Sequence, residues 1–112
     1  NNGDIVLKGI AGILEETLCS RTRYCRWGGE EFTVYMHCEH DYYEEAEVVR
    51  QSVEKAEFRS GDLVMKVTIS IGLCVAGTME SASMATLINQ ADQCLYKAKA
   101  QGKNCVMRVE IP

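Results

Sequence analysis

The sequence predicts one small α/β domain in which amphipathic helices alternate with short strands. A length of 112 residues is enough for a single hydrophobic core. In three segments apolar residues recur at three- and four-residue steps, the spacing of a helix that buries one face. Short runs rich in β-branched and aromatic residues lie between them and are typical of strands. The predicted helices are 4–18, 42–56 and 83–100, and the predicted strands are 22–27, 32–37, 67–74 and 105–109.

Each predicted helix has a recognisable end. Asn2 or Asp4 would cap the first helix and Asp41 the second, because such side chains accept a hydrogen bond from an orphan backbone N–H. Gly102 stands at the C′ position of the third helix, with lysines clustered around it. In the second helix we expect the charged residues to form a solvated face without a functional role. That face comprises Glu44, Glu45, Glu47, Arg50, Glu54 and Lys55.

Composition excludes several classes of protein. The hydrophobic share is 46% and the formal net charge is −4, so no surface for nucleic acid is indicated. No apolar run approaches the roughly 20 residues of a membrane helix. Because the chain opens on Asn1 rather than Met, we expect it to be part of a longer protein.

The six cysteines indicate neither a zinc site nor a disulfide framework. No two of them form a Cys-x-x-Cys pair, and no secretory context accompanies them. Cys25, Cys74 and Cys94 lie within apolar runs, which predicts reduced, buried thiols. His37 and His40 bracket Cys38, but we expect these residues on a strand-to-helix connection rather than at a metal.

A Gly-Gly pair separates two of the β-prone runs, Tyr24–Trp27 and Phe32–Met36. It predicts a tight hairpin turn, since Gly28 and Gly29 adopt positive φ without steric cost. Bare backbone amides suit phosphate, and the carboxylates of Glu30 and Glu31 suit a hard divalent cation. On spacing alone, a plain hairpin with acidic residues kept for solubility remains an equal alternative.

Four blocks resemble the GGDEF family of diguanylate cyclases, in its variant with Glu at the third position. Gly28-Gly29-Glu30-Glu31-Phe32 matches the family motif itself. The other three blocks, in the family's order, are Asn2-Gly3-Asp4, Val67-Thr68-Ile69-Ser70-Ile71-Gly72, and Ala91 to Lys99 followed by Gly102-Lys103-Asn104. The resemblance implies a partial GGDEF domain over 1–112. It also implies a ferredoxin-like cyclase-palm sandwich, with a mostly antiparallel sheet flanked by helices.

The family's activity is implied for the whole protein rather than for this segment alone. That activity is a nucleotidyl transfer: two GTP condense into cyclic di-GMP, a bacterial second messenger, with release of pyrophosphate. By resemblance, Glu30 is catalytic and Glu30 and Glu31 hold Mg²⁺ or Mn²⁺. Gly28 and Gly29 admit phosphate, and Asp4 reads guanine.

The resemblance assigns the triphosphate to Lys99 and Lys103, and the family usually has Arg where this chain has Lys103. Arg binds phosphate bidentately, whereas Lys acts as a point charge. Catalysis would need a homodimer, since each of two domains presents one GTP. The alternatives are a domain that binds GTP or a partner without chemistry, and a purely structural dimerisation unit.

Two family features are missing from this sequence. An Asp-rich first strand precedes Asn1 in the family, so either a longer chain carries it or a partner chain supplies it. The resemblance also implies an upstream sensor or regulatory domain, in a protein that is cytoplasmic or whose cytoplasmic part belongs to a membrane-anchored sensor. The Arg-x-x-Asp product site is also absent, because Cys19-Ser20-Arg21-Thr22 has its Arg out of register and lacks the Asp. We therefore expect no inhibitory product site.

Overall fold

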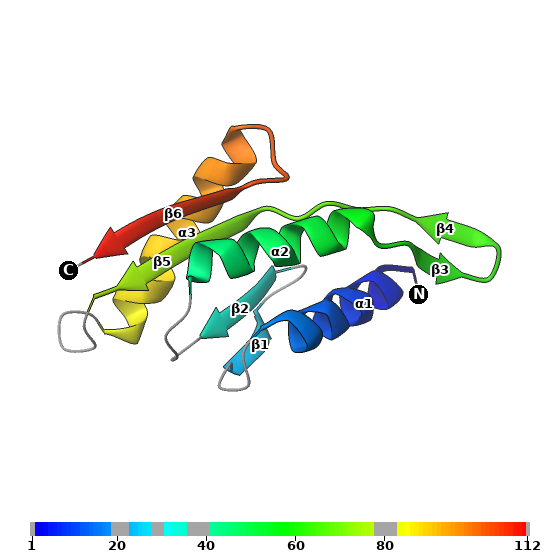
Figure 1. The fold of residues 1–112 in the computed structure, drawn as a ribbon, viewed down its shortest axis with the longest axis horizontal. Coiled ribbons are helices and arrows are strands. Elements are labelled where there is room, and N and C mark those ends of the chain that lie inside the picture. The colour runs from blue at the N-terminus through cyan, green and yellow to red at the C-terminus, as the bar shows by residue number, and fades with distance from the viewer. Residues whose placement is uncertain (1, 19–22, 28–30, 36–40, 78–82, 112) are drawn as a thin grey trace.

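The computed structural model describes residues 2–18, 23–27, 31–35, 41–77 and 83–111 (Figure 1). The side chains of 23–27 and 31 lie outside this description. In chain order the elements are α1 (Asn2–Thr17), β1 (Arg23–Trp27), β2 (Glu31–Tyr35), α2 (Tyr42–Lys55), β3 (Phe58–Ser60), β4 (Leu63–Met65), β5 (Ile71–Ala76), α3 (Met84–Ala100) and β6 (Val106–Ile111).

The strands of the described ranges pair into three two-stranded sheets. β1 pairs with β2 and β3 with β4, both antiparallel, while β5 and β6 run parallel. Parallel strands need a long crossover, and α3 supplies it between β5 and β6. The mixed α/β class predicted from the sequence is therefore confirmed, with two of these three pairings antiparallel.

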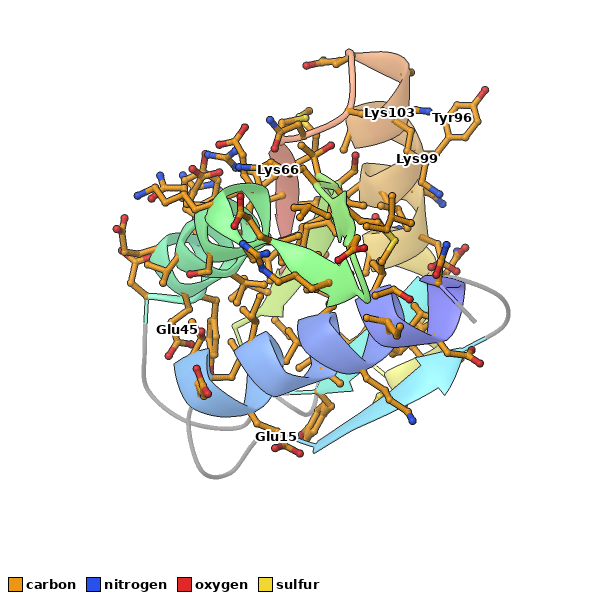
Figure 2. The ribbon with its side chains drawn as sticks, turned by 90° about the vertical axis from the view of Figure 1, so that its right-hand side faces the viewer. Glu15, Glu45, Lys66, Tyr96, Lys99 and Lys103 are labelled. Atoms are coloured by element: carbon orange, nitrogen blue, oxygen red, sulfur yellow. The ribbon has the colours of Figure 1, made fainter. Side chains whose placement is uncertain are left out.

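The helices cover the strands in layers. α2 and α3 lie on opposite sides of the β5–β6 pair, and α1 lies alongside α2 (Figure 2). The molecule is elongated, with extents of 50 × 31 × 24 Å, and the β3–β4 hairpin lies at one end of the long axis (Figure 1). None of the helices over the described ranges is long and apolar enough to cross a membrane.

The core lies where α1 and α2 meet β3. Its five buried members come from these three elements and are Ile10, Leu14, Val49, Val53 and Phe58. Val53 is fully buried. Burying such apolar side chains is the main favourable term in folding, of roughly 1.5–3 kcal/mol for each. This cluster therefore holds α1, α2 and β3 together.

The predicted helix caps are confirmed in one case and wrong in another. Asp41 caps α2, since its Oδ1 accepts a hydrogen bond of 3.0 Å from the Glu44 backbone N–H. α3 begins at Met84, one residue after its predicted start, because Ser83 is its cap. Asn2 and Asp4 do not cap α1, since both lie within that helix. In the first turn the Asp4 carboxylate is instead favoured by the helix dipole.

The strand predicted over 67–74 is displaced along the chain to Ile71–Ala76. Val67, Thr68 and Ile69 have strong strand propensity, but a strand also needs a ladder partner. That partner is β6, whose first residue, Val106, stands opposite Ile71. The register thus sets the start of β5, and β6 likewise runs to Ile111 rather than ending at 109.

Gly72 lies where β5 meets the backbone of α3. A Cβ at this position would collide with the Ala91 carbonyl oxygen and the Leu95 backbone, reaching the Leu95 Cα at 2.8 Å. The neighbouring atoms belong to a helix backbone and cannot rotate away. Only glycine therefore permits α3 to pack this closely on β5.

Replacing Gly72 should destabilise the fold. We expect Gly72→Ala to lower the free energy of unfolding by about 1–3 kcal/mol, as overpacking does in other cores. The measurement is urea denaturation followed by circular dichroism. Gly12→Ala in α1 is the matched control, because a Cβ there meets nothing within 4 Å. The control should raise stability by up to about 1 kcal/mol, and equal effects of the two changes would contradict this packing account.

Candidate functional site

The hairpin predicted around the Gly-Gly pair is present, and its strands pair up to Trp27 opposite Glu31. Gly28, Gly29 and Glu30 join these two ends and lie outside the described residues. Glu31 is the first residue of β2, and its side chain is likewise outside the description. His37, Cys38 and His40, which were not expected to bind a metal, also lie outside the described residues.

Strand β2 is anchored to the core directly after Glu31. Phe32 and Val34 pack against the buried cluster formed by α1, α2 and β3. Residues 32 and 34 are two positions apart, so they share one face of the strand. The end of β2 that carries Glu31 is thus held in place by the same cluster that fixes α2.

The remaining predicted site residues lie on α1, on α3 and in the turn that follows α3. Asp4 is exposed in the first turn of α1. Lys99 is exposed in the last turn of α3, and Lys103 is exposed three residues after that helix ends. Figure 2 shows Lys99 and Lys103 together at one end of α3, near Tyr96. In the portion of the chain that the structure describes, no group of three or more His, Cys, Asp and Glu residues is placed to hold a metal ion.

The turn after α3 is closed by a Schellman motif. Gln101 is the C-cap, and the Lys103 backbone N–H donates to the Ala98 carbonyl at 3.0 Å. Gly102 stands at C′ with φ of 115°, which confirms the predicted glycine stop. Lys103 follows at 63° and Asn104 at 48°, so three consecutive residues have positive φ.

Such a run needs support from its surroundings. A residue other than glycine in the left-handed region costs on the order of 1–3 kcal/mol, although Asn tolerates it better than most. Asn104 has three partners that hold it there. Its backbone N–H donates to Ser70 Oγ at 3.2 Å, its Nδ2 donates to Glu54 at 2.6 Å, and its Oδ1 accepts from Arg50 at 3.0 Å.

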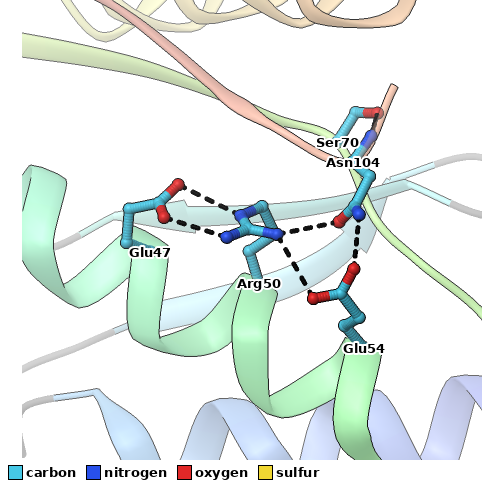
Figure 3. Close-up of polar contacts among 5 residues, drawn as sticks. All are labelled: Glu47, Arg50, Glu54, Ser70 and Asn104. Atoms are coloured by element: carbon cyan, nitrogen blue, oxygen red, sulfur yellow. Dashed lines mark hydrogen bonds and ion pairs between the residues drawn. The ribbon is translucent and has the colours of Figure 1, made fainter. Parts of the chain in front are cut away.

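Arg50 is the centre of this polar network (Figure 3). Its Nε and Nη2 donate to the two carboxylate oxygens of Glu47 at 3.1 and 3.0 Å. Its Nη1 donates to Asn104 and lies 3.7 Å from Glu54 Oε1. A bidentate Arg–carboxylate pair is the geometrically strongest form of salt bridge. The network thereby ties α2 to the turn that follows α3.

The prediction of a solvated face is wrong at Arg50 and Glu47. Their side chains are only 14% and 22% exposed. Positions 47, 50 and 54 are spaced to meet on one helix face, and that spacing was the available signal. The partner Asn104 lies 54 residues from Arg50, and no local pattern indicates such a contact.

The network perturbs the ionisation of its members. The hydrogen bond from Arg50 lowers the pKa of the Glu47 carboxyl, against the opposing effect of burial. The bond to Glu47 correspondingly raises the pKa of Arg50. Elsewhere, burial raises the pKa of the Cys74 thiol. Of the cysteines predicted to be buried, Cys94 is buried, Cys74 is only half-buried, and the side chain of Cys25 lies outside the description.

The lowered pKa of Glu47 predicts that the free energy of unfolding depends on pH. Because its folded-state pKa is below the ordinary glutamate value of 4.5, Glu47 stabilises the fold above that pH. This contribution is lost progressively as the pH falls from 4.5 through the lower folded-state pKa. Urea midpoints measured from pH 6 to pH 3 should fall less steeply for Glu47→Gln than for the unmodified protein. Parallel curves would contradict this assignment.

Comparison with known proteins shows the family. The family model described as "Diguanylate cyclase, GGDEF domain" matches residues 1–105. An uncharacterized membrane protein of Staphylococcus aureus (strain USA300) is 33% identical over 95% of this chain. The chain spans about a third of the length of such curated relatives, 31% in this case.

Solved structures give the same result. The diguanylate cyclase SiaD of Pseudomonas aeruginosa, determined in complex with its activator SiaC, is 31% identical, with a TM-score of 0.80. The match covers 95% of this chain and 41% of that one. The active GGEEF domain of a diguanylate cyclase from Vibrio cholerae is 26% identical, with a TM-score of 0.79, over 96% and 68% of the two chains. The chain therefore belongs to the GGDEF family of diguanylate cyclase domains.

Proposed function

We propose that this domain condenses two GTP into cyclic di-GMP and releases pyrophosphate. The observation that carries the proposal is an intact Gly28-Gly29-Glu30-Glu31-Phe32 motif within a chain that belongs to the diguanylate cyclase family. The structural similarity to two solved diguanylate cyclases supports the proposal. The product would serve as a bacterial second messenger.

In this proposal, the two lysines at the end of α3 hold the triphosphate. Lys99 and Lys103 are both exposed and lie at the same end of that helix (Figure 2). The backbone N–H groups of Lys103 and Asn104 already donate within the protein, so side chains rather than amides would meet the anion. Asp4, exposed on α1, would accept hydrogen bonds from the guanine N–H groups.

The hairpin would supply the reacting end of the site. Gly28 and Gly29 would let the α-phosphate approach the backbone, and Glu30 would accept the proton of the attacking hydroxyl. The carboxylates of Glu30 and Glu31 are the donor type that Mg²⁺ or Mn²⁺ takes, and such an ion bound there would offset phosphate charge. Because Phe32 is packed on the core, the motif would be presented from a fixed strand.

Two domains must face each other for this reaction. The 3′-hydroxyl of each GTP attacks the α-phosphate of the other, which forms two phosphodiester bonds and releases two pyrophosphates. Each domain would hold one GTP, so the active form is a homodimer. This proposal places the domain, as a partial GGDEF unit over 1–112, in the cytoplasmic part of a larger sensor. Its similarity to an uncharacterized membrane protein supports that setting.

The second candidate is a module that binds GTP or a protein partner without chemistry. The feature that favours it is Lys103, since a point charge grips a phosphate less specifically than the bidentate guanidinium of Arg. The intact motif argues against it, because a binding module has no need of Glu30.

The test is an assay of the complete protein that contains this domain. With GTP and Mg²⁺ we expect cyclic di-GMP, detected by chromatography, and Glu30→Gln should reduce its rate at least about a hundredfold, as loss of a general base does. Glu16→Gln, which changes an exposed glutamate of α1, is the matched control and should leave the rate unchanged. Tight GTP binding without product would reject the cyclase and favour the binding module.

A further inference from the structure

We propose that Arg50 and Asn104 are positioning residues, which set the direction in which Lys103 meets the nucleotide phosphates. The inference rests on the proposed function, since it takes Lys103 to be a phosphate contact. It adds Arg50, on α2, to a site whose sequence motifs lie on other elements. Its basis is the network of Figure 3, which connects α2 to the turn after α3.

The direction of the Lys103 side chain depends on the backbone of its turn. With φ of 63°, Lys103 lies between Gly102 at 115° and Asn104 at 48°. A return of any of these residues to negative φ would redirect the Lys103 Cα–Cβ bond. The Schellman bond from Lys103 to Ala98 fixes the helix side of the turn. The C-terminal side of the turn has no such helix bond, and the contacts of Asn104 hold it instead.

Asn104 holds its side of the turn through bonds to two different elements. Its backbone N–H donates to Ser70, directly before β5, while its side chain bonds Arg50 and Glu54 on α2. Both polar atoms of the amide are thereby engaged. The guanidinium of Arg50 is in turn oriented by the bidentate pair with Glu47. The chain of contacts from Glu47 to Lys103 is therefore continuous.

Contacts other than the network also hold α2 against the rest of the domain. Val49 and Val53 on α2 are buried in the core cluster, at 2% and 0% exposure. The guanidinium of Arg108 on β6 also lies 4.7 Å from the ring centroid of Tyr43 on α2, a cation–π contact. Removing Arg50 should thus leave α2 in place and release mainly the turn.

The experiment is a double-mutant cycle between Arg50 and Lys103 in the complete protein. The readout is the Kd of a GTP analogue with a methylene bridge between the α- and β-phosphates, which cannot release pyrophosphate. Calorimetry measures the unmodified protein, Arg50→Ala, Lys103→Ala and the double variant. Arg59→Ala is the matched control, because Arg59 pairs only with Glu57 among the contacts described and is 65% exposed.

If Arg50 acts through Lys103, Arg50→Ala should weaken binding about tenfold in the unmodified background and less than about twofold once Lys103 is alanine. Arg50→Lys should give an intermediate loss, because an ammonium cannot reproduce the forked contacts to Glu47 and Asn104. Arg59→Ala should leave the Kd unchanged. Urea denaturation at the assay temperature confirms that each variant is folded.

Two results would overturn the inference. If the losses of Arg50→Ala and Lys103→Ala multiply in the double variant, the network stabilises the fold without directing Lys103. If Arg50→Ala is folded and binds normally, the network has no role in the site. Either result can occur while cyclic di-GMP is still made. Conversely, the double-mutant cycle could show the expected coupling in a protein that makes no cyclic di-GMP. That result would reject the proposed cyclase activity and leave the positioning role of Arg50 intact.

Discussion

The hydrogen bond between Arg50 and Asn104 is the constraint on which the geometry at the end of α3 depends. Three successive residues with positive φ follow that helix, and two of them are not glycine. Such backbone is unfavourable unless its neighbours hold it. The side chain of Asn104 links this turn to α2 through hydrogen bonds to Arg50 and Glu54. The bond from Arg50 holds the Asn104 amide in its orientation. The position of Lys103 follows from these contacts.

Helix α2 supports both halves of the proposed site. One face of the helix carries Val49 and Val53, which pack in the cluster that also receives Phe32 of the motif strand. Another face carries Arg50, which reaches the turn that bears Lys103. The strand that carries the motif carboxylates and the turn that carries Lys103 are therefore both supported by α2. A change in α2 would move the two ends relative to each other.

Features with a local physical cause were predictable from the sequence. The Asp41 cap and the Gly102 stop each depend on a residue and its near neighbours, and the structure confirms both. The start of β5 was not predictable from propensity, since the register with β6 decides it. The Arg50 network was missed for the same reason, because its partner Asn104 is brought close only by the fold. The motif residues Gly28 to Glu30 were found by resemblance, and their roles stay predictions.

A crystal structure of the complete domain with Mg²⁺ and the methylene-bridged GTP analogue would show directly whether Lys103 binds the phosphates. We expect its ammonium at hydrogen-bond distance, about 2.7–2.9 Å, from a phosphate oxygen. We also expect the Arg50–Asn104 bond to persist in that complex. A nucleotide bound with Lys103 turned away from its phosphates, or with the Arg50–Asn104 contact broken, would show that this network does not position Lys103.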